Sequence, residues 1–304
     1  MSNPLLNRVT NDAQRGYAGF RESGVRSQQG FGGQGYAPQQ PGQYGQQGYG
    51  RPQPGFGEPG SAPGLGGDGG GGRAITLDDV IMRTGALFAV LVAVAAAAWV
   101  ASAVSPALGG ILFMVGLVGT LGLGLYIAFR RKPVGPTLAM VYAVVEGVFV
   151  GAISQTYHVM FDASGGSVFE SIVTQAVLAT LCVFGSMLLL YKTGVIKVTD
   201  KFRSIVSMMV MGYFVFSMIN LGYMLFFNGS PFGFGGTGWL GIGISLFAIG
   251  LAAVMLTLDF DNIDKAISAG LPASFAWTLA IGLVITLVWL YLEILRLLGR
   301  LRSE

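Results

Sequence analysis

The chain has 304 residues, of which 52% are hydrophobic and only 11% are charged, with a formal net charge of +3. Soluble domains carry about 25% charged residues, so this composition argues against an ordinary soluble enzyme and indicates a polytopic membrane protein. The small positive excess comes from arginines in loops and in the amino-terminal region, so no nucleic-acid partner is expected.

The amino-terminal region differs in composition from the rest of the chain. Gly, Gln, Pro and Tyr dominate Tyr36–Gly64, and aliphatic residues are almost absent there. Such a segment cannot bury enough apolar surface to offset the entropy lost on ordering. We therefore predict a disordered tail over residues 1–75, acting as a solvated tether, with a specific binding role as the alternative. The membrane domain is expected over residues 76–304.

Seven apolar stretches are long enough to cross a hydrocarbon core, which takes about 20 helical residues. Thr76 is the predicted N-cap ahead of the first, and Pro106 is expected to end it. Glycines of the second should allow close helix contact; they are Gly116, Gly119, Gly122 and Gly124. The sequence thus predicts an all-α, seven-helix transmembrane bundle, with helices at 84–104, 107–129, 136–157, 170–191, 204–227, 238–258 and 273–298.

Loop charges predict the orientation of the bundle. Lys and Arg occur in the loops after the second, fourth and sixth helices, but not in the loops after the third and fifth. By the positive-inside rule, the tail and the basic loops should be cytoplasmic in a multi-pass protein of the plasma (inner) membrane. Seven spans place the carboxyl end outside, although Arg296, Arg300 and Arg302 cluster there. Either the last helix tolerates outside charge or it re-enters; because earlier loops dominate orientation, seven spans are expected.

Glu146 is the most informative single residue of the predicted membrane domain. It lies about ten residues into the third helix, which is about 15 Å at the helical rise and close to the bilayer midplane. An ionisable group at that depth should face the bundle interior or water. The functional hypothesis is a cation-binding or proton-binding site. The alternative is a protonated glutamate hydrogen-bonded to a neighbouring helix.

Three carboxylates follow the apolar run of the sixth helix: Asp259, Asp261 and Asp264. Asp259 and Asp261 are two positions apart, about 200° around a helix, so they cannot both face one pore. Asp259 is the better candidate for an ion pathway and pH sensing, although Asp261 stays in the candidate set. Asp261 and Lys265 have the spacing of a surface ion pair, and Asp264 should be solvated. The alternative for the cluster is an ordinary polar helix end.

Two further pairs of charged residues are expected to have mainly structural or topological roles. Glu293 and Arg296 lie three residues apart in the last helix and should form an interfacial ion pair. Arg130 and Arg131 first of all set the topology. A latch between one of these arginines and Asp259 is a hypothesis, because all of them are expected near the cytoplasmic face.

Several kinds of chemistry find no support in the sequence. One histidine, His158, rules out a multi-histidine metal site, and one cysteine, Cys182, rules out an intramolecular disulfide. No Walker loop, zinc motif or nucleophile–base pair is present. We therefore expect no enzymatic activity, no bound metal and no cofactor.

Short motifs in a characteristic order carry a family resemblance. The third-helix stretch Tyr142–Ser154 reads YAVVEGVFVGAIS, and the sixth predicted helix is followed by Asp259–Ile263, DFDNI. The last helix closes with Trp289–Leu298, WLYLEILRLL, and the chain begins with Met1–Arg8, MSNPLLNR. With these motifs the chain resembles a bacterial branch of the Bax inhibitor-1 family over roughly residues 75–304.

The resemblance implies a seven-helix bundle with the last helix at its centre, and a pH-sensitive leak of calcium as the permeant ion. In that family two aspartates, one on each of the last two helices, share a proton and gate the pore. Asp259 matches the first of them. The corresponding part of the last helix, Leu283–Thr286, has no acid, so the paired gate departs from the family pattern here.

Two other functions stay open beside the leak. A non-conducting regulator would bind a membrane-anchored protease or another partner, for which a cytoplasmic tail would be a contact. A proton-coupled carrier would require repeated halves, which the sequence does not reveal. All three hypotheses require the protein to lie in a lipid bilayer.

Overall fold

The computed structural model describes residues 73–162, 167–226 and 232–303, all within one of the two compact units into which the chain divides. The regular secondary structure of these residues is helical, with one isolated bridge between Ala74 and Pro272. The predicted all-α, seven-helix membrane architecture is confirmed, since seven of the described helices are long and apolar enough to span a bilayer. The predicted disordered tail lies outside the described residues up to position 72.

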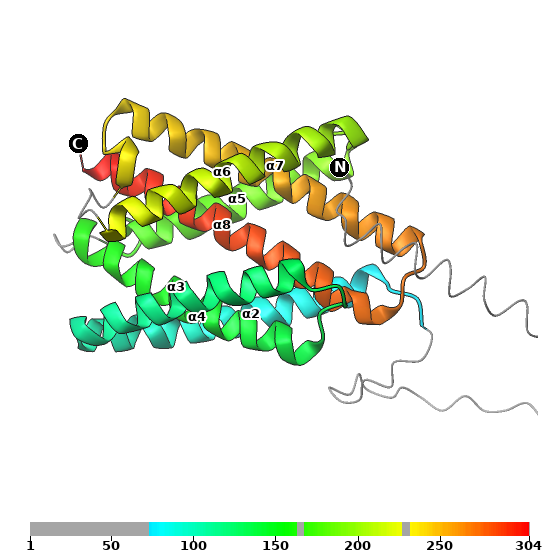
Figure 1. Cartoon of the computed structure of the whole chain (residues 1–304), viewed down its shortest axis with the longest axis horizontal. Coiled ribbons are helices and arrows are strands. Elements are labelled where there is room, and N and C mark those ends of the chain that lie inside the picture. Colours follow the sequence, from blue (N-terminus) through cyan, green and yellow to red (C-terminus); the bar gives the residue numbers. More distant parts are fainter. Residues whose placement is uncertain (1–72, 163–166, 227–231, 304) are drawn as a thin grey trace, which may run out of the picture. The chain divides into compact units, whose positions relative to one another are not determined.

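Two short 3-10 turns, η1 and η2, accompany the seven long helices, and Figure 1 shows their arrangement. The elements in chain order are α2 (Leu77–Val104), α3 (Pro106–Phe129), α4 (Pro136–Phe161), α5 (Ile172–Lys192), α6 (Asp200–Phe226), η1 (Gly233–Gly235), α7 (Trp239–Ser268), η2 (Ala273–Phe275) and α8 (Ala276–Arg302).

Local sequence explains the starts of α2 and α3. Thr76 caps α2 in a capping box, because its hydroxyl accepts from the Asp79 backbone while Asp79 accepts from the backbone of Thr76. Ser105 alone separates α2 from α3, whose first residue is Pro106. Proline is favoured at a first helical position because its missing N–H needs no partner there. Ile75, which the predicted boundary assigns to the tail, is buried against α7 and α8.

The predicted end of the sixth membrane helix is wrong by ten residues. Helix α7 continues from Leu258 to Ser268, so the three aspartates lie within the helix and not after it. The helix ends before Gly270, which has a positive φ of 62° and so takes a left-handed conformation that is cheap for glycine. A charged residue at a membrane boundary does not stop a helix, whereas a conformational change in the backbone does.

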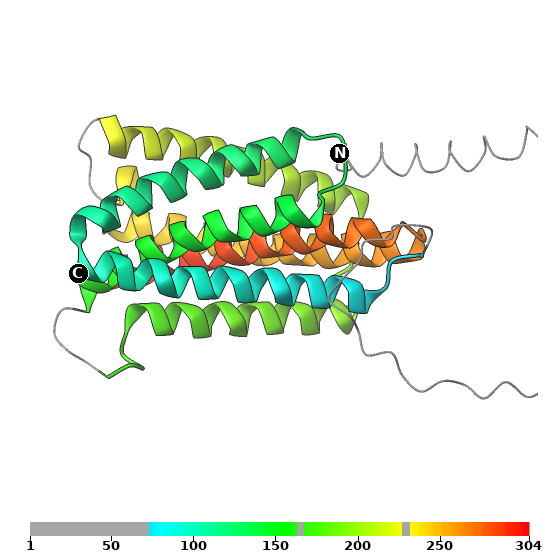
Figure 2. The same ribbon diagram turned by 90° about the horizontal axis from the view of Figure 1, so that it is seen from below.

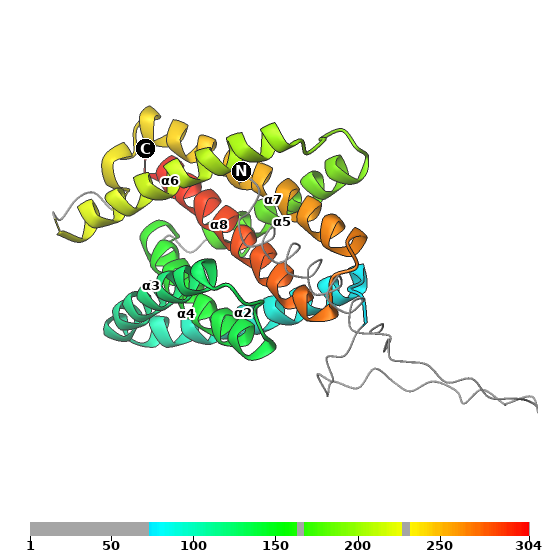
Figure 3. The ribbon, with the colours of Figure 1, turned by 45° about the vertical axis from the view of Figure 1, so that its right-hand side comes forward.

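Helix α8 forms the centre of the bundle. It packs on α7, α2, α5 and α4, and in Figure 3 it crosses between α2–α4 on one side and α5–α7 on the other. Figure 2 shows it in the same interior position from below. Its apolar window is the most buried of the seven, whereas α3 and α6 are mostly exposed. The expectation of a central last helix is therefore met.

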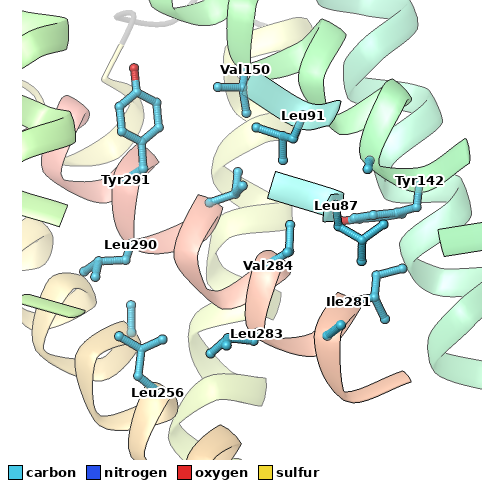
Figure 4. Packing of buried hydrophobic residues seen from close by; sticks show 14 of the residues in the cluster. Leu87, Leu91, Tyr142, Val150, Leu256, Ile281, Leu283, Val284, Leu290 and Tyr291 are labelled. Atoms are coloured by element: carbon cyan, nitrogen blue, oxygen red, sulfur yellow. The ribbon is translucent and has the colours of Figure 1, made fainter. Parts of the chain in front are cut away.

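Apolar side chains of four helices fill the space around α8. Figure 4 shows Leu87 and Leu91 of α2 facing Val284 and Ile281 of α8, with Leu256 of α7 on the other side. Between lipid-embedded helices such close packing replaces the hydrophobic effect as the attractive force, because lipid tails are as apolar as leucine.

The last helix crosses the whole bundle. At its start, the Ala273 backbone N–H donates to the Arg73 carbonyl at 3.0 Å, and Arg83 donates to the Ala273 carbonyl at 2.6 Å. At its end, Arg302 forms an ion pair with Asp162, the residue that follows α4. Its 27 residues span about 40 Å at the helical rise. The described helix is therefore long and apolar enough to cross a bilayer, as the seven-span prediction requires.

We name the two ends of the bundle by their contacts. The proximal end holds the start of α2 and of α8, together with the basic loops that follow α3 and α5. The distal end holds the last turn of α8, the end of α4 and the start of α5 and α7. The sequence places Arg296, Arg300 and Arg302 toward the distal end.

Glycines set the closest helix contacts. Gly147 and Gly151 of α4 face α2, where a Cβ on Gly147 would lie 2.7 Å from the Leu91 carbonyl oxygen and one on Gly151 would fall on the Ala95 carbonyl. These two glycines thus allow α4 and α2 to pack closely. On α3, Gly116 presses on Phe149. Gly122 differs from the expectation, since it has open space around it.

Gly151→Ala should therefore destabilise the bundle strongly. The new methyl group meets backbone atoms of α2 that cannot rotate away, so α2 and α4 must move apart, at a cost of roughly 2–3 kcal/mol. Thermal unfolding in detergent would measure the loss. Gly122→Ala is the matched control, because it places the same methyl group in open space. Equal melting temperatures for the two variants would contradict the tight α2–α4 contact.

Candidate functional site: acidic residues around the central helix

Asp259 lies at the interface of α7 with the central helix. It is only 8% exposed and belongs to the buried face of α7 that includes Leu256 and Ile263. These positions are three and four residues away, so they share one side of the helix. The oxygen Oδ2 of Asp259 has no hydrogen-bond partner among the described residues. A buried carboxyl group in that state requires either a proton or a positive partner.

The side chain of Asp259 interacts with the hydroxyl group of Thr286 on α8. Thr286 also lies 3.2 Å from the Gly282 carbonyl oxygen, to which its hydroxyl donates. A hydroxyl group has one proton to donate. While Thr286 donates to Gly282, it can only accept from Asp259, and only a protonated Asp259 can donate. Thr286 thus stands within the stretch where the resemblance would place a second aspartate.

Asp261 points away from Asp259, as the helical spacing predicts. Its carboxylate forms ion pairs with Arg203 of α6 and, at 2.9 Å, with Lys265. Arg203 also donates to Asn262 at 2.6 Å. The predicted ion pair with Lys265 is therefore present, and a buried arginine from another helix joins it. This cluster fastens α6 to α7 and does not face α8.

Asp264, expected to be solvated, is exposed but not free of contacts. Its Oδ2 atom accepts a hydrogen bond of 2.6 Å from the Tyr191 hydroxyl of α5. Hence the three aspartates of α7 contact three different helices. Only Asp259 contacts the central one, and only Asp259 has no basic residue or strong hydrogen-bond donor beside it among the described residues.

Glu146 is buried on α4, with 3% of its surface exposed. Its carboxyl group faces the hydroxyl groups of Tyr142, one turn earlier, and of Thr120 on α3. The Oε2 atom has no hydrogen-bond partner among the described residues. Helix α4 packs extensively on α2 and α3 and more lightly on α8, and has little contact with α7. Glu146 and Asp259 therefore lie against different parts of the bundle and do not form one pair.

Glu293 and Arg296 do pair, with 3.1 Å between Arg296 Nη1 and each carboxylate oxygen. Glu293 is buried and also accepts a 2.7 Å hydrogen bond from the Tyr213 hydroxyl, so the pair is partly enclosed by the bundle. Tyr213, which sequence reasoning missed, connects the peripheral α6 to α8. Its position gives no sequence signal, since tyrosine in an apolar helix is common at membrane interfaces.

The structure does not bring the proposed latch residues to Asp259. The guanidinium group of Arg130 lies over the ring of Tyr126, 5.8 Å from its centroid, and Arg131 is exposed. Within the described parts of the chain, neither arginine forms an ion pair with Asp259. The latch stays a hypothesis about another state of the protein.

Comparison with known proteins agrees with this architecture. The family model described as "Bax inhibitor 1 like" matches residues 3–303, nearly the whole chain. A search of the curated proteins returned no match. Together with seven spanning helices and an acidic residue buried against the last one, this match identifies the chain as a member of the Bax inhibitor-1 family.

Proposed function

We propose that this protein is a pH-sensitive cation leak, with calcium as a permeant ion and Asp259 as the titrating gate. One observation carries the proposal: Asp259 is a carboxyl group buried at the central helix, and among the described residues a hydroxyl group but no basic residue lies beside it. Ionisable residues inside a membrane domain are costly and usually belong to ion or proton pathways. The choice of calcium as the permeant ion and the sensitivity to pH come from the family resemblance.

The gate would act through the contact between α7 and α8. With a proton bound, Asp259 donates to Thr286, and the two helices stay joined by a neutral hydrogen bond. When the proton leaves, the carboxylate can only accept, so Thr286 must turn from the Gly282 carbonyl, or water or a cation must enter. A charge in this apolar contact is unstable without such a partner. Proton loss therefore favours hydration of the interface between α7 and α8.

In this proposal Glu146 is a second acidic residue of the ion pathway, separate from the gate at Asp259. Its carboxylate is an oxygen ligand of the kind that calcium prefers, and it lies beside the hydroxyl groups of Tyr142 and Thr120. Its role would be to interact with the permeant cation and not to share a proton with Asp259, because the two residues belong to different helix contacts.

The proposed orientation places the proximal end in the cytoplasm of a cell whose plasma membrane holds the protein. The proximal loops and the proximal ends of the helices carry the basic residues expected inside; they are Arg73, Arg83, Arg130, Arg131, Lys132, Lys192, Lys197, Lys201, Arg203 and Lys265. With Cys182 replaced by serine, Lys132→Cys should react with an impermeant thiol reagent only from the cytoplasmic side. Labelling of intact cells from outside would reverse the orientation.

Calcium flux into liposomes containing the purified protein, measured across a pH series, tests the function. We expect uptake above that of protein-free liposomes, with a clear dependence on pH. If the protein passes no cation at any pH, the leak is refuted and the regulator hypothesis takes its place. A membrane-anchored protease copurifying with the full chain would then be the partner to look for.

A further inference from the structure

The last turn of the central helix brings a buried arginine to the distal end of the bundle. Arg300 is only 2% exposed. Its Nη1 atom donates to the Gly241 carbonyl and, at 2.7 Å, to the Ser245 hydroxyl, and its Nη2 atom donates to the Phe232 carbonyl at 3.1 Å. The guanidinium group also lies over the Phe232 ring, 5.6 Å from its centroid. One side chain thus joins α8, the start of α7 and the segment beside η1.

Arg300 differs from its two neighbouring arginines in its charge balance. Arg296 is paired with Glu293, and Arg302 is paired with Asp162. For Arg300 no carboxylate lies within ion-pair distance among the described residues, and its hydrogen-bond partners are neutral oxygens. A buried charge without a counter-charge is costly, and its retention in a membrane protein usually has a functional reason.

Close backbone packing surrounds the same turn. A Cβ on Gly299 would lie 2.8 Å from a ring atom of Tyr157 on α4, so a larger residue on this side of α8 would have to displace that ring. A Cβ on Gly241 would lie 3.1 Å from the Arg300 side chain. The last turn of α8 therefore fits between α4 and α7 with little free space, and Arg300 fills the side toward α7.

We propose that Arg300 closes the distal end of the bundle and presents a fixed positive charge to entering cations. Buried arginines in other membrane pores act as electrostatic barriers of this kind. The inference rests on the proposed leak for its role in conduction, and makes Arg300 a determinant of rate and selectivity. The pathway would then have a titrating barrier at Asp259 and a permanent one at Arg300.

Arg302 makes a neighbouring contact at the same end of the bundle, with Asp162. Burial raises the pKa of Asp162, but hydrogen bonds from His158, Ser171 and the Ile172 backbone, with the charge of Arg302, outweigh it and lower the pKa below its usual value. A carboxylate with a lowered pKa keeps its stabilising contacts above its unfolded-state pKa and loses them only as the pH falls through the folded-state pKa. The Arg302–Asp162 contact therefore persists through the neutral range.

Thiol accessibility tests the closure without requiring ion flux. Ser154 of α4 is buried and shares a 2.7 Å hydrogen bond with the Tyr291 hydroxyl of α8. In the full chain with Cys182→Ser, a Ser154→Cys thiol should react very slowly with an impermeant methanethiosulfonate added at the distal side. Adding Arg300→Gln should speed the reaction about tenfold or more, because several hydrogen bonds to a charged group are lost.

Matched variants keep this test decisive. Arg302→Gln is the comparison, since it removes a positive charge from the same turn of α8 but leaves the contacts of Arg300 with α7 in place, so its increase should be smaller. If Arg300→Gln does not fold, Ser245→Ala removes one acceptor of Arg300 and should give a smaller increase. An unchanged rate in both variants, or an equal increase with Arg302→Gln, would overturn the closure.

Flux measurements then separate the two proposals. With Arg300→Gln, calcium uptake by liposomes should rise severalfold at every pH, while the pH of half-maximal flux stays that of the parent. Faster labelling without any cation flux in parent or variant would leave the closure standing and refute the leak. Faster labelling with flux unchanged would refute Arg300 as a barrier to cations.

Discussion

Asp259→Asn should abolish most of the pH dependence of calcium flux while leaving the protein folded. Asparagine has nearly the same size as a protonated aspartate and can still donate to Thr286, but it has no titrating proton. Flux should therefore hold one nearly constant level across the pH series in liposomes. A single buried carboxyl group next to a neutral hydroxyl leaves no second acid at this position to restore the response.

The control for this variant must be an acid without structural contacts. Asp264 would be the choice from the sequence, but its hydrogen bond from Tyr191 means that its loss also loosens α5 from α7. Asp78, which is exposed in the first turn of α2, is the better control. A flux profile for Asp78→Asn as flat as that for Asp259→Asn would mean that surface charge alone sets the pH response.

Helix existence could be predicted from the sequence, whereas one helix end could not. The hydropathy of seven stretches, a capping residue at Thr76 and proline at two helix starts each act locally, so they determine α2–α4 without knowledge of the bundle. The end of α7 depended on interpreting Asp259 as a boundary. The helix continues because Asp261 and Asp264 are satisfied by other helices, which is information that only tertiary packing contains.

The same distinction between local sequence signals and tertiary packing applies to the candidate site. The 100° turn per residue was enough to predict that Asp259 and Asp261 face different ways. It could not predict that Arg203 would meet Asp261, or that Tyr213 would meet Glu293, because those partners are 58 and 80 residues away. Thr286 and Arg300 could have been singled out from the sequence, because both are polar residues of the helix that the family resemblance places at the centre of the bundle.

Thr286→Asp should change the form of the pH response. It places a second carboxyl group opposite Asp259, at the stretch where the resemblance implies the family's second aspartate. Two carboxyl groups in contact cannot both ionise without strong repulsion, so their protons leave in two steps that belong to the pair. We expect the flux profile to show two steps separated by more than about one pH unit, where the parent shows one.

Thr286→Asn is the matched control for this experiment, since it has the shape of aspartate but cannot ionise. It should retain a single step, because Asp259 still titrates alone. Combining Thr286→Asp with Asp259→Asn should restore one step, now belonging to position 286, because each variant then carries one acid at the contact between α7 and α8. If Thr286→Asp leaves one step at the parent's pH, the side chains at 259 and 286 do not meet in the conducting protein, and the gate must lie elsewhere.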